Sequence, residues 1–151
     1  MAINTEALNR PQVLRECAEA YGSQAVVCSI EAKRQQYGWE AYMWGGREPS
    51  GRGVVEWAQE AVSWGAGEIL LTSVDQDGLQ TGCDLELIHA VAQALPQTPL
   101  IASGGIGEAQ HARDALEAGA DAIAVASLLH TQPGLLQFKA ELSNAGVLIR
   151  W

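Results

Sequence analysis

The sequence predicts an α/β fold in which short parallel strands alternate with helices. Short apolar runs bounded by turn residues recur along the chain, and segments with a helical spacing of apolar residues separate them. A weak internal repeat supports this unit, because the pattern Gly-Ala-x-x-Ile-x-x-x-Ser occurs at residues 65–73 and again at residues 119–127. Each Gly-Ala pair is expected to end a helix, and each serine to stand at the carboxyl end of a strand.

The first elements are expected to be a helix and a strand. Asn9 can cap the helix, Pro11 suits its first turn, and Gly22 is expected to end it after about Tyr21. Residues 25–30 then form a continuous apolar run, which is typical of a strand buried on both faces.

A hairpin-like excursion is expected next. Residues 39–44 are aromatic enough for a strand, whereas the glycine-rich residues 45–53 predict a loop. The remaining elements alternate, with helices at residues 54–64, 84–94, 108–118 and from Pro133 to Gly146, and strands at residues 68–73, 100–102 and 122–126. The chain is therefore expected to be one helix followed by about four parallel strand–helix units.

Two of the predicted strand ends have the chemistry of an anion site. They are residues 102–105, Ala-Ser-Gly-Gly, and the pair Ala126-Ser127. A glycine pair lets the backbone approach a ligand, and a helix N-terminus beyond it supplies free N–H groups and the positive end of a dipole. The last two units of a (β/α)8 barrel hold a phosphate in this way. The sequence therefore predicts a binder of a phosphorylated small molecule.

Length, charge and cysteine content narrow this interpretation. A complete (β/α)8 barrel needs roughly 250 residues, whereas the chain has 151, so a single half-barrel domain over residues 1–151 is expected. The formal net charge of −9 disfavours nucleic-acid binding, which depends on Lys and Arg contacts with phosphates. The three cysteines have no zinc spacing, and neither a metal nor another cofactor is expected. Without a signal peptide or a membrane-length apolar run, the expected compartment is the cytoplasm.

Candidate acid and base residues lie near the ends of two predicted strands. Asp75 and Asp77 lie in a glycine-containing turn, where barrel enzymes keep their catalytic groups, although such carboxylates can also anchor the loop. Glu31 ends the first strand and is a second candidate for acid–base chemistry. The alternative for Glu31 is a surface ion pair with Lys33 or Arg34, which would contribute little.

Several short motifs follow one another along nearly the whole chain. They are Ile3-Asn4-Thr5, residues 22–27, Ala32-Lys33-Arg34, residues 45–49, residues 65–73, Asp75-x-Asp77-Gly78, Gly82-x-Asp84 and residues 101–105. Together they resemble the C-terminal half of the cyclase subunits of imidazole glycerol phosphate synthase, a family of histidine biosynthesis. The sister isomerase of the same pathway shares the barrel and the phosphate sites, but residues 68–73 and 82–84 are more similar to the cyclase.

The resemblance implies a reaction and a partner. In this family, ammonia delivered through the barrel from a glutaminase subunit attacks a bis-phosphorylated formimino-aminoimidazole carboxamide ribonucleotide. Ring closure and cleavage yield imidazole glycerol phosphate and an aminoimidazole carboxamide ribotide. Two aspartates act as acid and base, one on the first strand of the barrel and one on the fifth. The fifth-strand aspartate corresponds to Glu31 in this chain, and the first-strand aspartate belongs to the N-terminal half.

The resemblance also implies roles for individual residues. Asp77 corresponds to an auxiliary carboxylate of the catalytic site, and Glu68 to a charged residue at the ammonia entrance on the opposite face. Asn4 and Thr5 correspond to part of one phosphate grip. The second grip corresponds to Thr72, Gly78, Gly104, Gly105, Ala126 and Ser127, with Ser103 from the strand end described above.

An isolated half-barrel is expected to be inactive or weakly active. One extra methylene at Glu31 moves the carboxylate by more than about 1 Å, which is enough to lose orders of magnitude in rate. The competing interpretation is a non-catalytic, phosphate-binding module that associates with itself. In either case the open strand edges are expected to pair with an N-terminal half-barrel or with a second copy, as a homodimer or higher oligomer.

Overall fold

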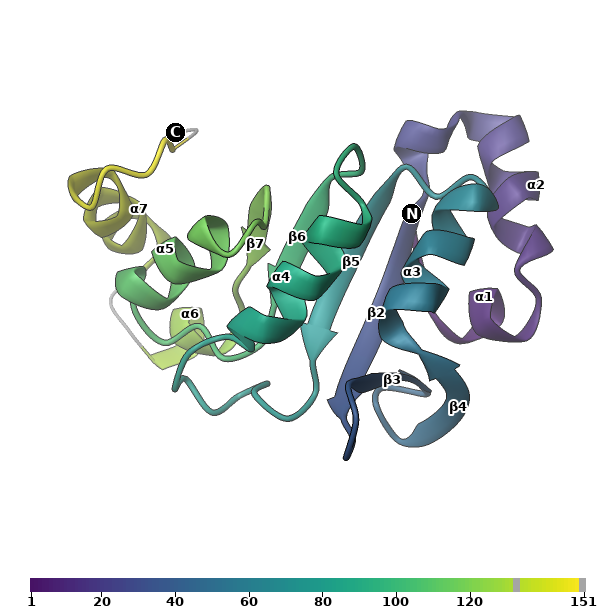
Figure 1. The fold of residues 1–151 in the computed structure, drawn as a ribbon. Helices are drawn as coiled ribbons and strands as arrows, with labels where there is room; N and C mark the ends of the chain where they lie inside the picture. Colours follow the sequence, from purple (N-terminus) through teal and green to yellow (C-terminus); the bar gives the residue numbers. More distant parts are fainter. Residues whose placement is uncertain (132–133, 150–151) are drawn as a thin grey trace.

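The computed structural model describes residues 1–131 and 134–149 and confirms the α/β class (Figure 1). Its strands form one open sheet in the order β4-β3-β2-β5-β6-β7, with β1 also paired to β2. The strands are β1 (Ala2–Ile3), β2 (Val27–Arg34), β3 (Trp39–Met43), β4 (Glu48–Gly53), β5 (Glu68–Ser73), β6 (Leu100–Ser103) and β7 (Ala122–Ala124). The sheet is not closed, as a partial (β/α)8 barrel requires.

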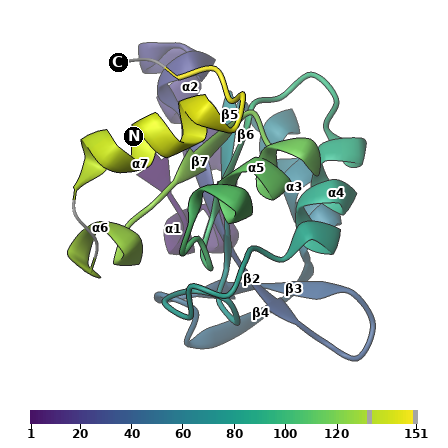
Figure 2. The same ribbon diagram turned by 90° about the vertical axis from the view of Figure 1, so that its left-hand side faces the viewer.

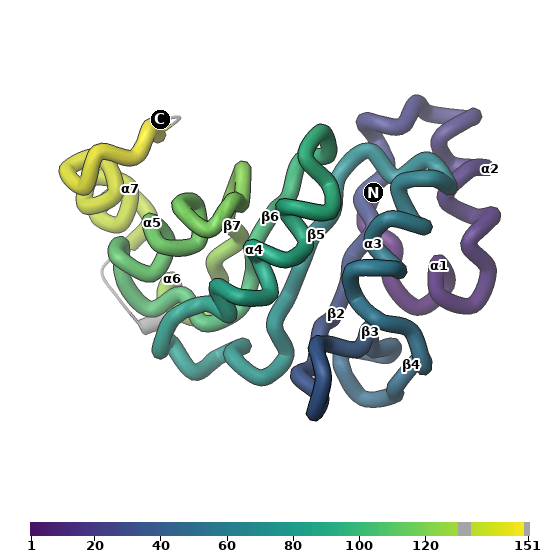
Figure 3. The backbone as a smooth tube through the Cα atoms, in the orientation of Figure 1, coloured from purple at the N-terminus to yellow at the C-terminus, as the bar shows by residue number. Residues whose placement is uncertain are grey.

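The helices divide between one face of the sheet and its two ends. Figures 1 and 2 show α3, α4 and α5 together on one side of the strands, and Figure 3 shows α1 and α2 at the opposite end of the sheet from α6 and α7. The helices are α1 (Thr5–Asn9), α2 (Gln12–Tyr21), η1 (Ser23–Ala25), α3 (Val54–Ser63), α4 (Leu85–Ala94), α5 (Ala109–Glu117), α6 (Ser127–Thr131) and α7 (Leu135–Asn144). The predicted helix start at Pro133 lies outside the described residues.

The central strands are parallel, as the alternation of strands and helices predicts. Within the described residues, β1 and β5 pair with β2 in parallel, and β6 and β7 continue the parallel sheet beyond β5. The hairpin of β3 and β4 is antiparallel and pairs with the carboxyl-terminal part of β2. In Figure 1 this hairpin lies at the same end of the molecule as the loop after β5.

Burial alternates along the strands, so only one face of the sheet is covered. In β2, Cys28, Ile30 and Ala32 are fully buried, whereas the intervening side chains are half-buried. The buried face packs against α3 and α4 in one hydrophobic core that includes Trp57 and Val91. The expectation that this strand is buried on both faces is therefore wrong, because no layer of the described residues covers its second face.

Three local expectations differ from the structure. Asn9 ends the short helix α1, and α2 has Pro11 as its N-cap residue without a side-chain cap. Residues 48–53, expected as a loop, form β4 because the backbone of β3 pairs with them. The first strand also continues to Arg34. Residues 31–34 all pair with β3, and residues 31 and 32 pair with β5 as well.

Cys28 makes the stability of the fold sensitive to alkaline pH. Burial raises the pKa of the Cys28 thiol from its ordinary 9.0 to about 12. The folded chain therefore keeps the proton at pH values where the unfolded chain loses it. The resulting contribution to stability is complete below about pH 9 and is lost as the pH rises toward 12.

We expect the free energy of unfolding to fall between about pH 9 and 11, with Cys28 contributing up to about 1.4 kcal/mol per pH unit. Urea titrations under reducing conditions measure this slope for the wild type and for Cys28→Ala. The variant is less stable at neutral pH because it loses buried volume, but its stability should decline less steeply. Equal slopes for the two proteins would contradict the assignment.

Candidate functional site

One small pocket at the carboxyl ends of the strands contains most of the predicted phosphate residues. It lies between the loops that follow β5, β6 and β7. The predicted residues that line it are Asp77, Gly78, Ser103, Gly104, Gly105, Ala126 and Ser127. Gln80, Ile106, Ala124 and Val125 complete the lining and were not predicted. Gln80 lies in the glycine-rich loop between Gly78 and Gly82, but nothing in its residue type points to the pocket.

The glycine pair is required by contacts between loops. Gly104 and Gly105 are buried and have φ angles of +92° and +88°, a region that side-chain-bearing residues rarely adopt. A Cβ atom at Gly104 would lie 2.7 Å from the carbonyl oxygen of Ser73, and one at Gly105 would overlap the carbonyl oxygen of Gly82. The amide of Gly82 also donates a hydrogen bond to the Gly105 carbonyl, at 2.8 Å. Close packing of the loops after β5 and β6 therefore shapes the pocket.

The helix after the glycine pair begins where the sequence predicts it, near residue 108. The N-cap of α5 is Glu108, so residues 106–108 separate Gly105 from the helix. The second strand end leads directly into α6 at Ser127, a helix of 5 residues. The pocket is therefore lined mainly by loop residues, together with the first residue of α6.

A row of side chains connects this pocket to the candidate acid–base residue. Glu31 on β2 is in register with Thr72 on β5, Thr72 with Ser103 on β6, and Ser103 with Ala124 on β7. All four are half-buried and share the open face of the sheet. Since neighbouring strands lie about 4.8 Å apart, Glu31 and Ser103 are separated by about 10 Å along this row. A sugar phosphate can bridge that distance.

The carboxylate of Glu31 binds the β3–β4 turn. Its Oε2 atom accepts a hydrogen bond of 2.6 Å from the amide of Gly46. Within the described part of the chain, Glu31 makes no ion pair with Lys33 or Arg34, so the alternative surface pair is wrong. The longer side chain of glutamate instead reaches across the open end of the sheet to the hairpin.

Asn4 and Thr5 also hold the hairpin and do not line the pocket. The amide nitrogen of Asn4 donates to the carbonyl oxygens of Ser29 (3.0 Å) and Tyr42 (3.1 Å). The Thr5 hydroxyl donates to Asn4 Oδ1 at 2.9 Å and accepts from the backbone amide of Trp44 at 3.0 Å. These residues stand at the carboxyl end of β1, separated from the pocket by β2 and β5.

The two aspartates of the β5–α4 loop have different surroundings. Asp75 Oδ2 accepts a hydrogen bond of 2.8 Å from the backbone amide of Arg34, so Asp75 anchors the loop. Asp77 is exposed and lines the pocket. Asp75 therefore anchors the loop. Asp77 is the carboxylate that faces the pocket, where a ligand could contact it.

Glu68 lies at the opposite end of the sheet. It opens β5 and is in register with Val27, the first residue of β2. Its half-buried side chain shares the open face with Thr72, four residues further along the strand. This position agrees with the predicted entrance on the far side of a barrel, and the role itself stays a prediction.

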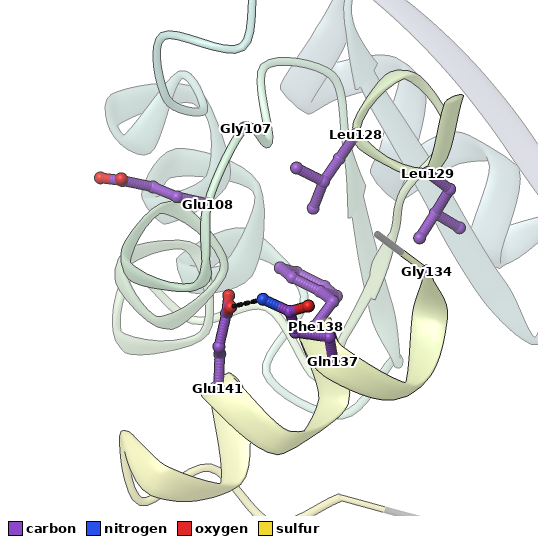
Figure 4. A pocket seen from close by; sticks show the side chains of 8 residues that line it. All are labelled: Gly107, Glu108, Leu128, Leu129, Gly134, Gln137, Phe138 and Glu141. Carbon is purple, nitrogen blue, oxygen red and sulfur yellow. Dashed lines mark hydrogen bonds between the residues drawn. The ribbon is translucent and has the colours of Figure 1, made fainter. Parts of the chain in front are cut away.

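A second pocket lies outside the strand ends, between α6, α7 and the residues that precede α5 (Figure 4). Its volume is about 240 Å³, and Figure 4 shows Leu128, Leu129 and Phe138 around it. The Glu141 carboxylate accepts a hydrogen bond from Gln137 at 3.0 Å. Glu108 and Glu141 make this pocket unfavourable for a phosphate. Elsewhere in the described residues, no group of three His, Cys, Asp or Glu side chains could hold a metal ion.

The open, mostly parallel sheet, with its candidate pocket at the carboxyl strand ends, has the architecture of a partial (β/α)8 barrel. A family model described as histidine biosynthesis protein matches residues 1–133, and the chain belongs to this family. No helix of residues 1–131 and 134–149 has the length and apolar character needed to cross a membrane.

Curated relatives match the chain over nearly its whole length. It is 44% identical over 153 residues to the imidazole glycerol phosphate synthase subunit HisF of Streptococcus sanguinis, and 49% identical over 154 residues to that of Myxococcus xanthus. A third, from a Synechococcus species, is 46% identical over 159 residues. Each match covers 99% of the chain but only 60% or 61% of the relative. The chain thus spans about three fifths of the length of these relatives.

Substitution of Gly105 should damage the fold of the pocket more than substitution of Gly78. Both glycines have a positive φ, but nothing lies within 4 Å of a Cβ atom at Gly78. We expect Gly78→Ala to cost about 1–2 kcal/mol of unfolding free energy from backbone strain alone, and Gly105→Ala to cost more. Urea unfolding of both variants measures the difference. Equal losses would mean that the contact with the Gly82 carbonyl is not tight in solution.

Proposed function

We propose that the chain forms the C-terminal part of the cyclase site of imidazole glycerol phosphate synthase and binds its bis-phosphorylated ribonucleotide substrate. The observation that carries this proposal is the row from Glu31 through Thr72 to Ser103. It joins a carboxylate suited to acid–base chemistry to a pocket lined by the glycine-rich loops after β5 and β6 and by the start of α6. The names of the relatives support the same reaction.

In this proposal one phosphate of the substrate occupies the pocket between the loops after β5, β6 and β7. Backbone amides near Gly78, Gly104 and Ser127 donate to it without adding formal charge, as suits a chain with a net charge of −9. Asp77 lies at the rim and serves as the auxiliary carboxylate. The second phosphate reaches the carboxyl end of β1 near Asn4 and Thr5, where backbone groups rather than the occupied side chains are available.

Catalysis requires Glu31 to act as one of the two acid–base groups. One oxygen of its carboxylate accepts the hydrogen bond from the Gly46 amide, so the other oxygen is the one free of that contact. The second group comes from the N-terminal half of a complete barrel. Ammonia from a glutaminase subunit would enter near Glu68, and the expected compartment for the reaction is the cytoplasm.

The 151-residue chain on its own should turn over the substrate several orders of magnitude more slowly than a complete subunit, because one acid–base group is missing. Addition of a separately produced N-terminal half-barrel should restore part of the activity. Glu31→Asp should raise it further, since the shorter side chain releases Gly46. The measurement is product formation with ammonia as the nitrogen source. Fast turnover by the chain alone, or no effect of Glu31→Asp in the reconstituted protein, would contradict these roles.

Phosphate binding can be tested separately from catalysis. Titration with inorganic phosphate should shift the amide NMR signals of residues 77–78, 103–105 and 126–127. Asp77→Asn should tighten binding about two- to fivefold, because it removes a negative charge at the rim. Glu19→Gln removes the same charge from the exposed face of α2 and serves as the matched control. Unchanged signals at these residues would mean that the pocket is not a phosphate site.

The second candidate function is a non-catalytic phosphate-binding module that associates with itself. The half-buried open face, with Leu70 and Ile101 in register on it, favours coverage by another sheet. The isomerase of the same pathway is the alternative enzyme, and an isomerase assay on the reconstituted protein distinguishes it from the cyclase.

The open sheet should make the 151-residue chain self-associate when no N-terminal half is present. Two copies can meet edge to edge, with β7 of each completing the sheet of the other, so that both apolar faces are enclosed. Sedimentation at micromolar concentrations is expected to give a dimer or a larger oligomer. A well-folded monomer would contradict this expectation.

A further inference from the structure

We propose that Arg34 is a positioning residue that holds both ends of the β5–α4 loop and thereby aims Asp77 and Gly78 at the pocket. The inference rests on the proposed function only in taking this pocket as the phosphate site. Arg34 is the last residue of β2 and does not line the pocket itself. Any effect it has on a bound phosphate must therefore pass through the loop.

The first end of the loop is attached to the backbone of Arg34. Its amide donates a hydrogen bond of 2.8 Å to Asp75 Oδ2. The amide of Val74 donates to the carbonyl of Ala32 at 2.9 Å, which continues the pairing of β5 with β2 up to this point. Asp77 and Gly78 follow within three residues of this anchor.

The second end of the loop is attached to the side chain of Arg34. The guanidinium donates to both oxygens of Asp84, at 2.9 and 3.1 Å, and to Glu86 at 2.9 Å. The Asp84 side chain is only 7% exposed, and it also caps α4 by accepting from the amide of Leu87 at 3.1 Å. The loop therefore ends at a carboxylate that is nearly buried and fully engaged.

Trp39 on the neighbouring strand β3 supports the contact between Arg34 and Asp84. We call these three residues the clamp. The Trp39 ring lies under the guanidinium, with the Arg34 carbon 4.9 Å from the ring centre, and its indole N–H donates to Asp84 Oδ2 at 2.9 Å. A planar guanidinium can stack on the ring and contact two carboxylates at once, which a lysine ammonium cannot do. The hydrogen bond to Glu86 raises the pKa of Arg34, so the charge is present at every physiological pH.

The two ion pairs of Arg34 are expected to contribute unequally to holding the loop. The pair with Glu86 joins side chains that are 50% and 75% exposed, and such pairs contribute little. The contact with Asp84 is the important one, because the Asp84 side chain is only 7% exposed and a nearly buried carboxylate loses more when its cationic partner is removed. Loss of the guanidinium should therefore loosen the loop at this end while the anchor at Asp75, made by backbone, remains.

The test compares Arg34→Met and Arg34→Lys with Arg113→Met in the 151-residue chain. Arg113 is a matched control because it makes one exposed ion pair with Glu117 along α5, at 2.7 Å. Two quantities are measured: amide hydrogen exchange of residues 75–83, and the dissociation constant of inorganic phosphate. Trp39→Phe is a further variant, which keeps the ring and removes only the indole donor to Asp84.

We expect Arg34→Met to speed exchange in residues 75–83 about tenfold or more, while exchange in α3 and β2 stays within about twofold. Phosphate binding should weaken about fivefold or more, with Arg34→Lys nearly as weak and Trp39→Phe intermediate. Arg113→Met should leave both quantities within about twofold of the wild type.

Unchanged exchange in residues 75–83 of Arg34→Met would overturn the proposal, as would exchange that rises equally throughout the chain. Faster loop exchange with unchanged phosphate affinity would overturn it as well, because the loop would then not control the pocket. If the wild type binds no phosphate, the proposed function fails, and the local exchange alone decides whether Arg34 clamps the loop.

Discussion

The parallel pairing of β2, β5, β6 and β7 is the constraint on which the candidate site depends. Parallel strands that are joined through helices bring their carboxyl ends to one edge of the sheet, and their pairing sets which residues stand side by side there. In this chain the register places Glu31, Thr72, Ser103 and Ala124 in one row. A shift of one residue in any strand would turn its member of the row into the helix-covered core.

Packing between loops gives the pocket its shape. The positive φ angles of Gly104 and Gly105 and the carbonyl groups of Ser73 and Gly82 leave no room for side chains between the loops after β5 and β6. A buried backbone must satisfy its own polar groups, and the bond from Gly82 to Gly105 does so. A pocket preformed in this way binds without first ordering its loops, which reduces the entropic cost of binding.

At the open end of the sheet, side chains that are candidates for substrate contact also hold the β3–β4 turn. Glu31 and Thr5 are both suited to contact a substrate, yet each accepts a hydrogen bond from the β3–β4 turn, at Gly46 and Trp44. Those bonds add to the pairing of β3 with β2, which attaches the hairpin to the sheet. The same polar groups can therefore hold the hairpin in the free protein and be drawn toward a ligand when one binds.

The sequence by itself determined the alternation of strands and helices, because apolar periodicity and glycine stops are local signals. It also predicted most residues of the candidate pocket, since Ser103, Gly104 and Gly105 belong to a motif whose chemistry is carried by the backbone. It could not predict β4 at residues 48–53, whose strand form comes from pairing with β3. Nor could it predict that Arg34 meets Asp84 or that Glu31 reaches Gly46, contacts between residues 50 and 15 positions apart. Only the tertiary structure decides such contacts, because they depend on the order and register of strands and not on the residues beside them.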